Sequence, residues 1–209
     1  MKIITTSFFS LLAVLGAISA ISSCSNFRDI DGTWEGEPTD LAVPGLAQAT
    51  YTITLTLNPG DSRSEGDVVV SATVDMTDAA AGPLVGLESP WEASVAATAS
   101  MTGRYDIHDD DIKIYLSPSS LQVNVDPDGV TYRNNIADGT PSPVTDSLTA
   151  AAVTHYRVLL TAPLRIALSR YDELDDVRVR DGVMTAGMED AQGRDIHVTF
   201  RRPESPVSL

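Results

Sequence analysis

The chain has 209 residues, of which 43% are hydrophobic, and its formal net charge at pH 7 is −15. This length and composition predict one domain with a sizeable core, and the acidity repels phosphate backbones and anionic head groups, so we expect no nucleic-acid partner. Cys24 is the only cysteine, which excludes an intramolecular disulfide.

The first residues have the pattern of an export signal. Lys2 precedes an uncharged, apolar stretch over residues 3–21, and no basic residue follows it that would stop transfer across a membrane. The stretch ends in Ile21-Ser22-Ser23-Cys24, which resembles the lipobox of bacterial lipoproteins: an aliphatic residue, two small residues, and the cysteine that takes the lipid. An ordinary secretory signal is the alternative.

The lipobox predicts how the ends of the chain are organised. We expect residues 1–23 to be a signal peptide, residues 24–30 a tether, and Cys24 the site of lipid attachment, with acyl chains such as palmitate anchoring the protein in a membrane. Ser25 follows the cysteine, in place of the Asp that often retains such lipoproteins at the inner membrane, so we expect the outer membrane. Residues 204–209 are predicted to be a flexible tail.

The first half of the mature chain predicts strands. Residues 49–58 alternate apolar side chains with threonines, a period of two that is typical of a half-buried strand. Similar patterns predict further strands over residues 67–76, 91–107, 112–116 and 121–125. The last of these is expected to end at the turn sequence Asp126-Pro127-Asp128-Gly129.

The period changes from Val144 to Ser169, within an insertion predicted over residues 134–172. Apolar residues there recur at helical spacing and predict an amphipathic helix that packs on the strands. We expect Pro163 to break or kink it, with a second turn beginning near Ala162. The predicted apolar face consists of Leu148, Ala152, Tyr156, Leu159 and Pro163.

Three strands follow the helix, around residues 177–179, 183–188 and 196–200, with a hairpin turn at Asp181-Gly182. The whole pattern predicts a mainly β fold of about eight or nine antiparallel strands, with one helical insertion before the last three. A closed barrel removes exposed strand edges and suits this count, and a β-sandwich is the alternative.

Three short motifs resemble lipocalin-like bacterial lipoproteins. Gly32-Thr33-Trp34 is similar to the Gly-x-Trp opening of those barrels, residues 101–107 with 112–114 to a Gly-x-Tyr-x-Ile hairpin, and residues 196–202 to their last strand. The resemblance covers the beginning, middle and end of a barrel domain over residues 31–203. The helix departs from it, because in familiar lipocalins the helix follows the barrel.

The resemblance implies a cup that can hold a small apolar or amphipathic molecule. It also implies that Trp34 packs under a basic residue of the last strand and closes the barrel. Arg202 has the parity of Phe200 on that strand and is the expected partner, whereas Arg201 faces the other way. The residues proposed to line a ligand are Tyr51, Trp91, Tyr105 and Tyr115.

The sequence has no catalytic motif, so we expect no enzyme activity and no cofactor. His108, His155 and His197 lack metal-ligand spacing, and no metal site is predicted. The acidic segments 106–111 and 126–129 resemble fragments of calcium loops, but solvated turns are the simpler interpretation. No Gly-x-Ser-x-Gly motif is present.

Two functions are consistent with these features. The first is a lipid-anchored envelope protein whose barrel binds a small apolar or amphipathic ligand. The second is a non-enzymatic structural or interaction protein, whose barrel is filled by its own side chains and docks on an envelope protein partner. The volume inside the barrel distinguishes them.

Overall fold

The computed structural model describes residues 30–46, 48–62, 64–81, 91–134, 146–190 and 192–203. The predicted signal peptide, residues 24–29 of the tether with Cys24, and the tail lie outside these residues, whereas Ile30 is described and is buried in the core. Within them the fold is mainly β, with one α-helix and a 3-10 turn at Pro118–Ser120. The elements are β1 (Gly32–Gly36), β2 (Thr39–Asp40), β3 (Gln48–Pro59), β4 (Glu65–Asp78), β5 (Trp91–His108), β6 (Asp111–Leu116), β7 (Gln122–Asn134), α1 (Asp146–Ser169), β8 (Glu173–Arg180), β9 (Val183–Glu189) and β10 (Asp195–Arg201).

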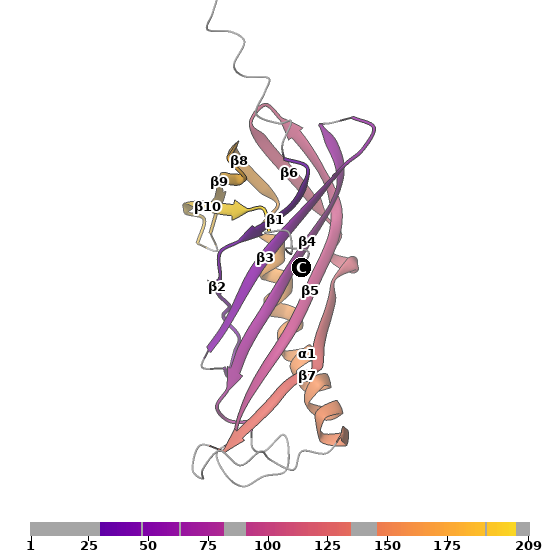
Figure 1. The fold of residues 1–209 in the computed structure, drawn as a ribbon, viewed down its shortest axis with the longest axis vertical. Coiled ribbons are helices and arrows are strands. Elements are labelled where there is room, and N and C mark those ends of the chain that lie inside the picture. The colour runs from indigo at the N-terminus through magenta and orange to yellow at the C-terminus, as the bar shows by residue number, and fades with distance from the viewer. Residues whose placement is uncertain are drawn as a thin grey trace, which may run out of the picture.

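The strands form a closed antiparallel barrel (Figure 1). The ring runs β1-β10-β9-β8-β6-β5-β4-β3 and returns to β1, because Trp34 of β1 pairs with Leu55 of β3. Two further strands extend this eight-stranded barrel, β2 beside β3 and β7 beside β5. The predicted barrel with a helix before the last three strands is therefore confirmed, and the sandwich alternative is wrong.

The long strands β3, β4 and β5 owe their pairing to the period-two pattern. In β3, the side chains of Tyr51, Ile53, Leu55 and Leu57 are buried, and the threonines between them are half-buried on the outer face. The register is unbroken from Gln48↔Thr77 to Pro59↔Gly66, so every buried residue of β3 faces the same side as its partner in β4. A shift by one residue would expose this whole apolar set, which fixes the register.

The strand β7 differs from the prediction, because the sequence 126–129 does not end it. Val125 pairs with Ala97 and Val130 with Val95, so residues 126–129 lie opposite Ala96 alone and form a bulge. The Asp128 N–H donates to the Asp126 carboxylate at 3.0 Å, which is the local turn that the sequence encodes. The predicted turn is present, but it does not end the strand. β7 pairs with β5 on both sides of Ala96, so the turn is accommodated as a bulge.

The helix α1 is continuous through Pro163, so the expected break near Ala162 is wrong. Pro163 has no N–H to donate to the Leu159 carbonyl. Packing compensates, because Leu160 and Leu164 on either side of Pro163 are completely buried. The predicted apolar face was also partly wrong: Ala152 and Tyr156 are buried as expected, but Leu148, Leu159 and Pro163 are only half-buried.

The strands β6 and β7 share one edge of β5 and divide the molecule into two halves. β6 pairs with Gly103–His108 and leads to β8, whereas β7 pairs with Trp91–Ser100 and has α1 beside it (Figure 1). Gly103 lies between the two pairings, where a Cβ atom would come within 2.3 Å of the Tyr115 carbonyl oxygen. Glycine is therefore required where β6 approaches β5 most closely.

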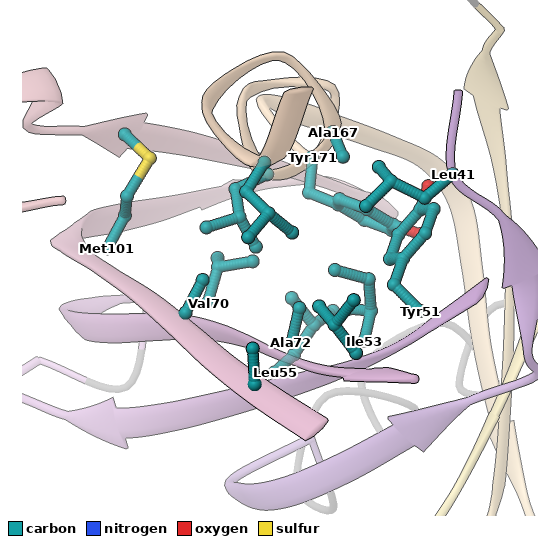
Figure 2. Close-up of a cluster of buried hydrophobic side chains, with 14 of the residues drawn as sticks. Leu41, Tyr51, Ile53, Leu55, Val70, Ala72, Met101, Ala167 and Tyr171 are labelled. Atoms are coloured by element: carbon teal, nitrogen blue, oxygen red, sulfur yellow. The ribbon is translucent and has the colours of Figure 1, made fainter. Parts of the chain in front are cut away.

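The core is one continuous cluster that joins both halves. Figure 2 shows it with α1 on one side, where Ala167 and Tyr171 face Ile53, Val70 and Ala72 from the long strands. The helix thus lies against the inner face of the sheet, and its buried side chains belong to the same core cluster as the inward-facing residues of the long strands.

Candidate functional site

The first candidate region is the closure site, formed by Trp34, Arg202 and the segment 30–32. The Trp34 indole is completely buried, and its Nε1 donates to the Ile30 carbonyl at 2.6 Å. The Arg202 guanidinium lies 4.4 Å from the centroid of the ring, and its Nη1 donates to the Asp31 carbonyl at 3.1 Å. The contact expected from the sequence is therefore present, and it joins the first and last strands of the barrel.

Glycine at position 32 is part of this closure. Its φ of +104° is accessible to few residues other than glycine, and a Cβ atom there would come within 3.0 Å of the Arg202 Nη1 atom. The parity assignment agrees with this contact: Arg201 is a paired residue of β10, opposite Glu35 and Val183, and Arg202, the next residue, lies over the Trp34 ring. The site therefore has a structural role: its contacts hold the first and last strands of the barrel together.

The four residues proposed to line a ligand do not surround one space. Tyr51, Trp91 and Tyr105 are buried in the core, whereas 61% of Tyr115 is exposed. Trp91 and Tyr105 lie on the same strand, fourteen positions apart, which at about 3.3 Å per residue corresponds to roughly 46 Å. Because Trp91 and Tyr105 are this far apart along β5, the four side chains do not line a single cavity.

Two of these tyrosines have a different role in the core. Tyr51 forms a side-chain hydrogen bond with Tyr171, and burial, followed by that contact, raises the pKa of Tyr171 well above its ordinary value. Burial also raises the pKa of Tyr105, with smaller contributions from Asp31 and Asp67. The Tyr105 hydroxyl is buried without a hydrogen-bond partner among the described residues. The hydroxyls of Tyr171 and Tyr105 are therefore protonated at neutral pH.

A buried polar cluster at the end of β4 was not predicted from the sequence. Asp78 is only 7% exposed, and its Oδ2 accepts a hydrogen bond from the Tyr156 hydroxyl at 3.0 Å. Its Oδ1 accepts from the Ala80 N–H at 2.9 Å. Burial, and next the charge of Asp78, raises the pKa of both Tyr156 and Tyr132. The cluster joins α1 to β4 across the core.

The Tyr132 hydroxyl is buried beside this cluster and has no hydrogen-bond partner within the part of the chain that the structure describes. The pattern of the helix identified Tyr156 as buried, but nothing in the sequence pairs it with Asp78, which is 78 residues away. The only available signal was an acid at the last inward-facing position of β4, where the alternation predicts an apolar residue.

A notch opens in the barrel wall where β6 extends beyond its pairing with β8. β8 pairs only with Ile112 and Lys113 of β6, so the end of β6 has β5 on one side and no paired strand on the other. The notch has a volume of about 470 Å³, and Met101 and Ile114, both buried residues, contribute to its lining. Its other lining residues are Lys113, Tyr115, Leu116, Pro118, Ser169, Asp172 and Glu173.

One ion pair crosses the rim of this notch. Lys113 Nζ lies 3.2 Å from Glu173 Oε1, and this hydrogen bond is the main reason that the pKa of Lys113 is raised. Of the four predicted ligand-lining residues, Tyr115 lines this notch. Other hollows lie beside the loop 41–46, about 610 Å³, and on the outer face of β3, β4 and β5, about 300 Å³.

His108 and His155 lie on different elements, β5 and α1. His108 Nε2 is 3.0 Å from Asp106 Oδ2 in an exposed hairpin, and His155 packs edge-on against Tyr156 with ring centroids 5.2 Å apart. The Asp110 carbonyl accepts from the Val177 N–H at 2.7 Å, so this turn ties β6 to β8. Among the described residues, no group of three or more His, Cys, Asp or Glu side chains is placed to hold a metal ion.

No helix within the described ranges has both the length and the hydropathy needed to cross a membrane. No protein-family model and no curated protein matches the chain. The resemblance to lipocalin-like lipoproteins therefore depends on the motifs quoted above and on a barrel that is compatible with a calycin-like fold.

Proposed function

We propose that this chain is a lipid-anchored protein of the bacterial outer membrane, whose filled barrel is a non-enzymatic docking domain for an envelope partner. The observation that supports docking over a cup is the position of α1. Its buried side chains belong to the same core cluster as the inward-facing residues of β3, β4 and β5, so they fill the space against the inner face of these strands.

The energy needed to empty that space supports the same proposal. Five larger side chains of α1 are buried: Val153, Tyr156, Leu160, Leu164 and Leu168. Each contributes about 1.5–3 kcal/mol through burial, so displacing them together costs about 10 kcal/mol, comparable with the whole stability of a typical domain. Opening the interior to a ligand would therefore resemble unfolding.

The anchor is proposed from Ile21-Ser22-Ser23-Cys24. Metabolic labelling with a fatty-acid analogue should mark the wild-type chain and leave Cys24→Ala unmarked. The labelled wild type should fractionate with the outer membrane. Equal labelling of the two chains would show that Cys24 carries no lipid.

Native mass spectrometry of the protein extracted from its own membrane tests the docking domain. We expect the mass of the acylated chain together with a second protein, and no small molecule that is released on unfolding. A constant small-molecule adduct would contradict the filled barrel. An acylated chain that retains no protein, even after chemical cross-linking in the intact envelope, would contradict docking.

A second candidate, binding of a small amphipathic ligand, is favoured by the notch beside Tyr115. Its volume of about 470 Å³ lies within the range of small-molecule sites, and it combines the apolar Met101 and Ile114 with a charged rim. Under this alternative an adduct seen by native mass spectrometry disappears in Tyr115→Ala and persists in Tyr132→Phe.

A further inference from the structure

Two of the large exposed hydrophobic residues of the described chain lie on α1, and the other two lie on β6 and β10. The large exposed ones are Tyr115 at 61%, Val158 at 73%, Ile166 at 61% and Ile196 at 38%. Val158 and Ile166 lie two helical turns apart on α1, with the exposed Ala162 between them, so the three form one stripe. This stripe is the side of α1 that points away from the core.

Tyr115 extends this apolar stripe. It lines the wall notch together with Ser169, the last residue of α1. Ser169 lies one turn beyond Ile166 on the same side of the helix, and it is exposed. Residues Val158, Ala162, Ile166 and Tyr115 are called the helix face below. Nothing in the packing of the barrel requires these large side chains to be apolar, because none of them is in the core cluster.

The charge of α1 is opposite to that of the protein. No Asp or Glu lies between Asp146 and Asp172, although the chain has 29 of them and a net charge of −15. The same segment contains Arg157, Arg165 and Arg170. Arg157 and Arg165 are exposed, and neither guanidinium forms an ion pair with any described residue. The helix face is therefore an apolar stripe flanked by two unneutralised cations.

We propose that the helix face docks on an anionic phospholipid surface, with α1 lying in the plane of the membrane. Aliphatic side chains on one stripe with arginines beside them are the pattern of interfacial helices. Tyrosine is favoured at the level of the head groups, where its ring is half in apolar surroundings. Arginine beside that stripe selects anionic head groups over neutral ones.

The acidity of the whole chain does not oppose this contact. At physiological ionic strength, charges more than about 8 Å away in solution are largely screened. Exposed acids such as Asp67 and Asp75 lie on the outer face of β4, and the barrel core separates that face from α1. Of the two acids that line the notch with Tyr115, Glu173 is paired with Lys113, and the exposed Asp172 lies beyond the C-terminal end of α1. The local charge of α1 therefore determines what approaches this face.

A fluorescent probe at two matched sites tests the proposal. The full chain is reconstituted in vesicles of phosphatidylcholine with phosphatidylglycerol, or of phosphatidylcholine alone, as Ile166→Cys or as Thr73→Cys, each labelled with an environment-sensitive maleimide. Thr73 is exposed on the outer face of β4, on the other side of the core. Wild-type protein treated in parallel reports any reaction at Cys24.

Quenching by spin-labelled lipid should be several-fold stronger at position 166 than at position 73 in vesicles with phosphatidylglycerol. The difference should disappear in phosphatidylcholine vesicles, in a chain that also carries Arg157→Glu and Arg165→Glu, and on raising salt from about 0.05 M to about 0.5 M. The proposal would be overturned by equal quenching at the two sites, or by quenching at position 166 that is the same with and without phosphatidylglycerol. The inference does not depend on acylation, which is measured separately by fatty-acid labelling.

Discussion

The closure site and the half of the barrel that contains α1 are held together by different means. At the closure site, one guanidinium, one indole and two backbone carbonyls join the first and last strands near the protein surface. In the half with α1, fully buried aliphatic side chains and the Asp78–Tyr156 hydrogen bond join a helix to a sheet. The closure site therefore adds a few polar contacts to the strand pairings of β1, whereas the half with α1 depends on buried apolar packing.

The largest effect is expected where α1 meets the core. Leu160→Asp places a carboxylate at a position that is 0% exposed, which costs several kcal/mol or more because no partner is available to it. We expect this variant not to fold, as seen by loss of the β signal in circular dichroism. Val158→Asp, two residues away and 73% exposed, should fold like the wild type. A folded Leu160→Asp would show that α1 is dispensable to the core.

A smaller effect is expected at the buried polar cluster. Tyr156→Phe leaves one oxygen of Asp78 without its hydroxyl donor, which should lower the free energy of unfolding by about 1–3 kcal/mol in urea denaturation. Tyr132→Phe is the matched control, because it removes a hydroxyl that has no hydrogen-bond partner in the described part of the chain. It should be neutral or slightly stabilising. Equal losses in the two variants would contradict the role of Asp78.

The same cluster predicts a dependence on pH. The pKa of Tyr156 is raised in the folded protein, whereas an unfolded tyrosine titrates near its ordinary value of about 10. The stabilisation is therefore fully present below about pH 10 and is lost as the pH rises above it, because the unfolded state releases its proton first. Tyr156→Phe should reduce this alkaline loss of stability. Tyr171, whose pKa is also raised, should account for part of what is left.

The sequence predicted the barrel because its evidence is local. Alternation in β3 and β4 fixes which side chains point inward, and that pattern determines the strand register without knowledge of the rest of the fold. The closure pair was predictable for a related reason: parity within β10 separates Arg202 from Arg201, and the resemblance supplied Trp34 as its partner.

The errors arose where packing overrides a local signal. Pro163 and the Asp126–Gly129 turn both disturb regular structure, yet α1 continues because Leu160 and Leu164 are buried on either side, and β7 continues as a bulge because β5 pairs with it beyond the turn. The packing of α1 on the inner face of the sheet, and the Asp78–Tyr156 contact that follows from it, depend on tertiary structure alone. Periodicity identifies the apolar side of a helix but not the surface that it covers.

The smallest effect in the comparison is expected at the closure site. Arg202→Ala removes the guanidinium from the Trp34 ring and its hydrogen bond to the Asp31 carbonyl, and should lower the free energy of unfolding by about 1–2 kcal/mol. Arg201→Ala should be nearly neutral, because the parity of the strand turns Arg201 away from Trp34, whereas Arg202 lies over the ring. Chemical denaturation followed by tryptophan fluorescence measures both variants, since Trp34 reports directly on the contact. If Arg201→Ala is the more costly change, the cation–ring contact does not hold the barrel closed. If Arg202→Ala instead prevents folding, as we expect for Leu160→Asp, then the closure site and the packing of α1 form one cooperative unit. The two regions would then not be held together independently.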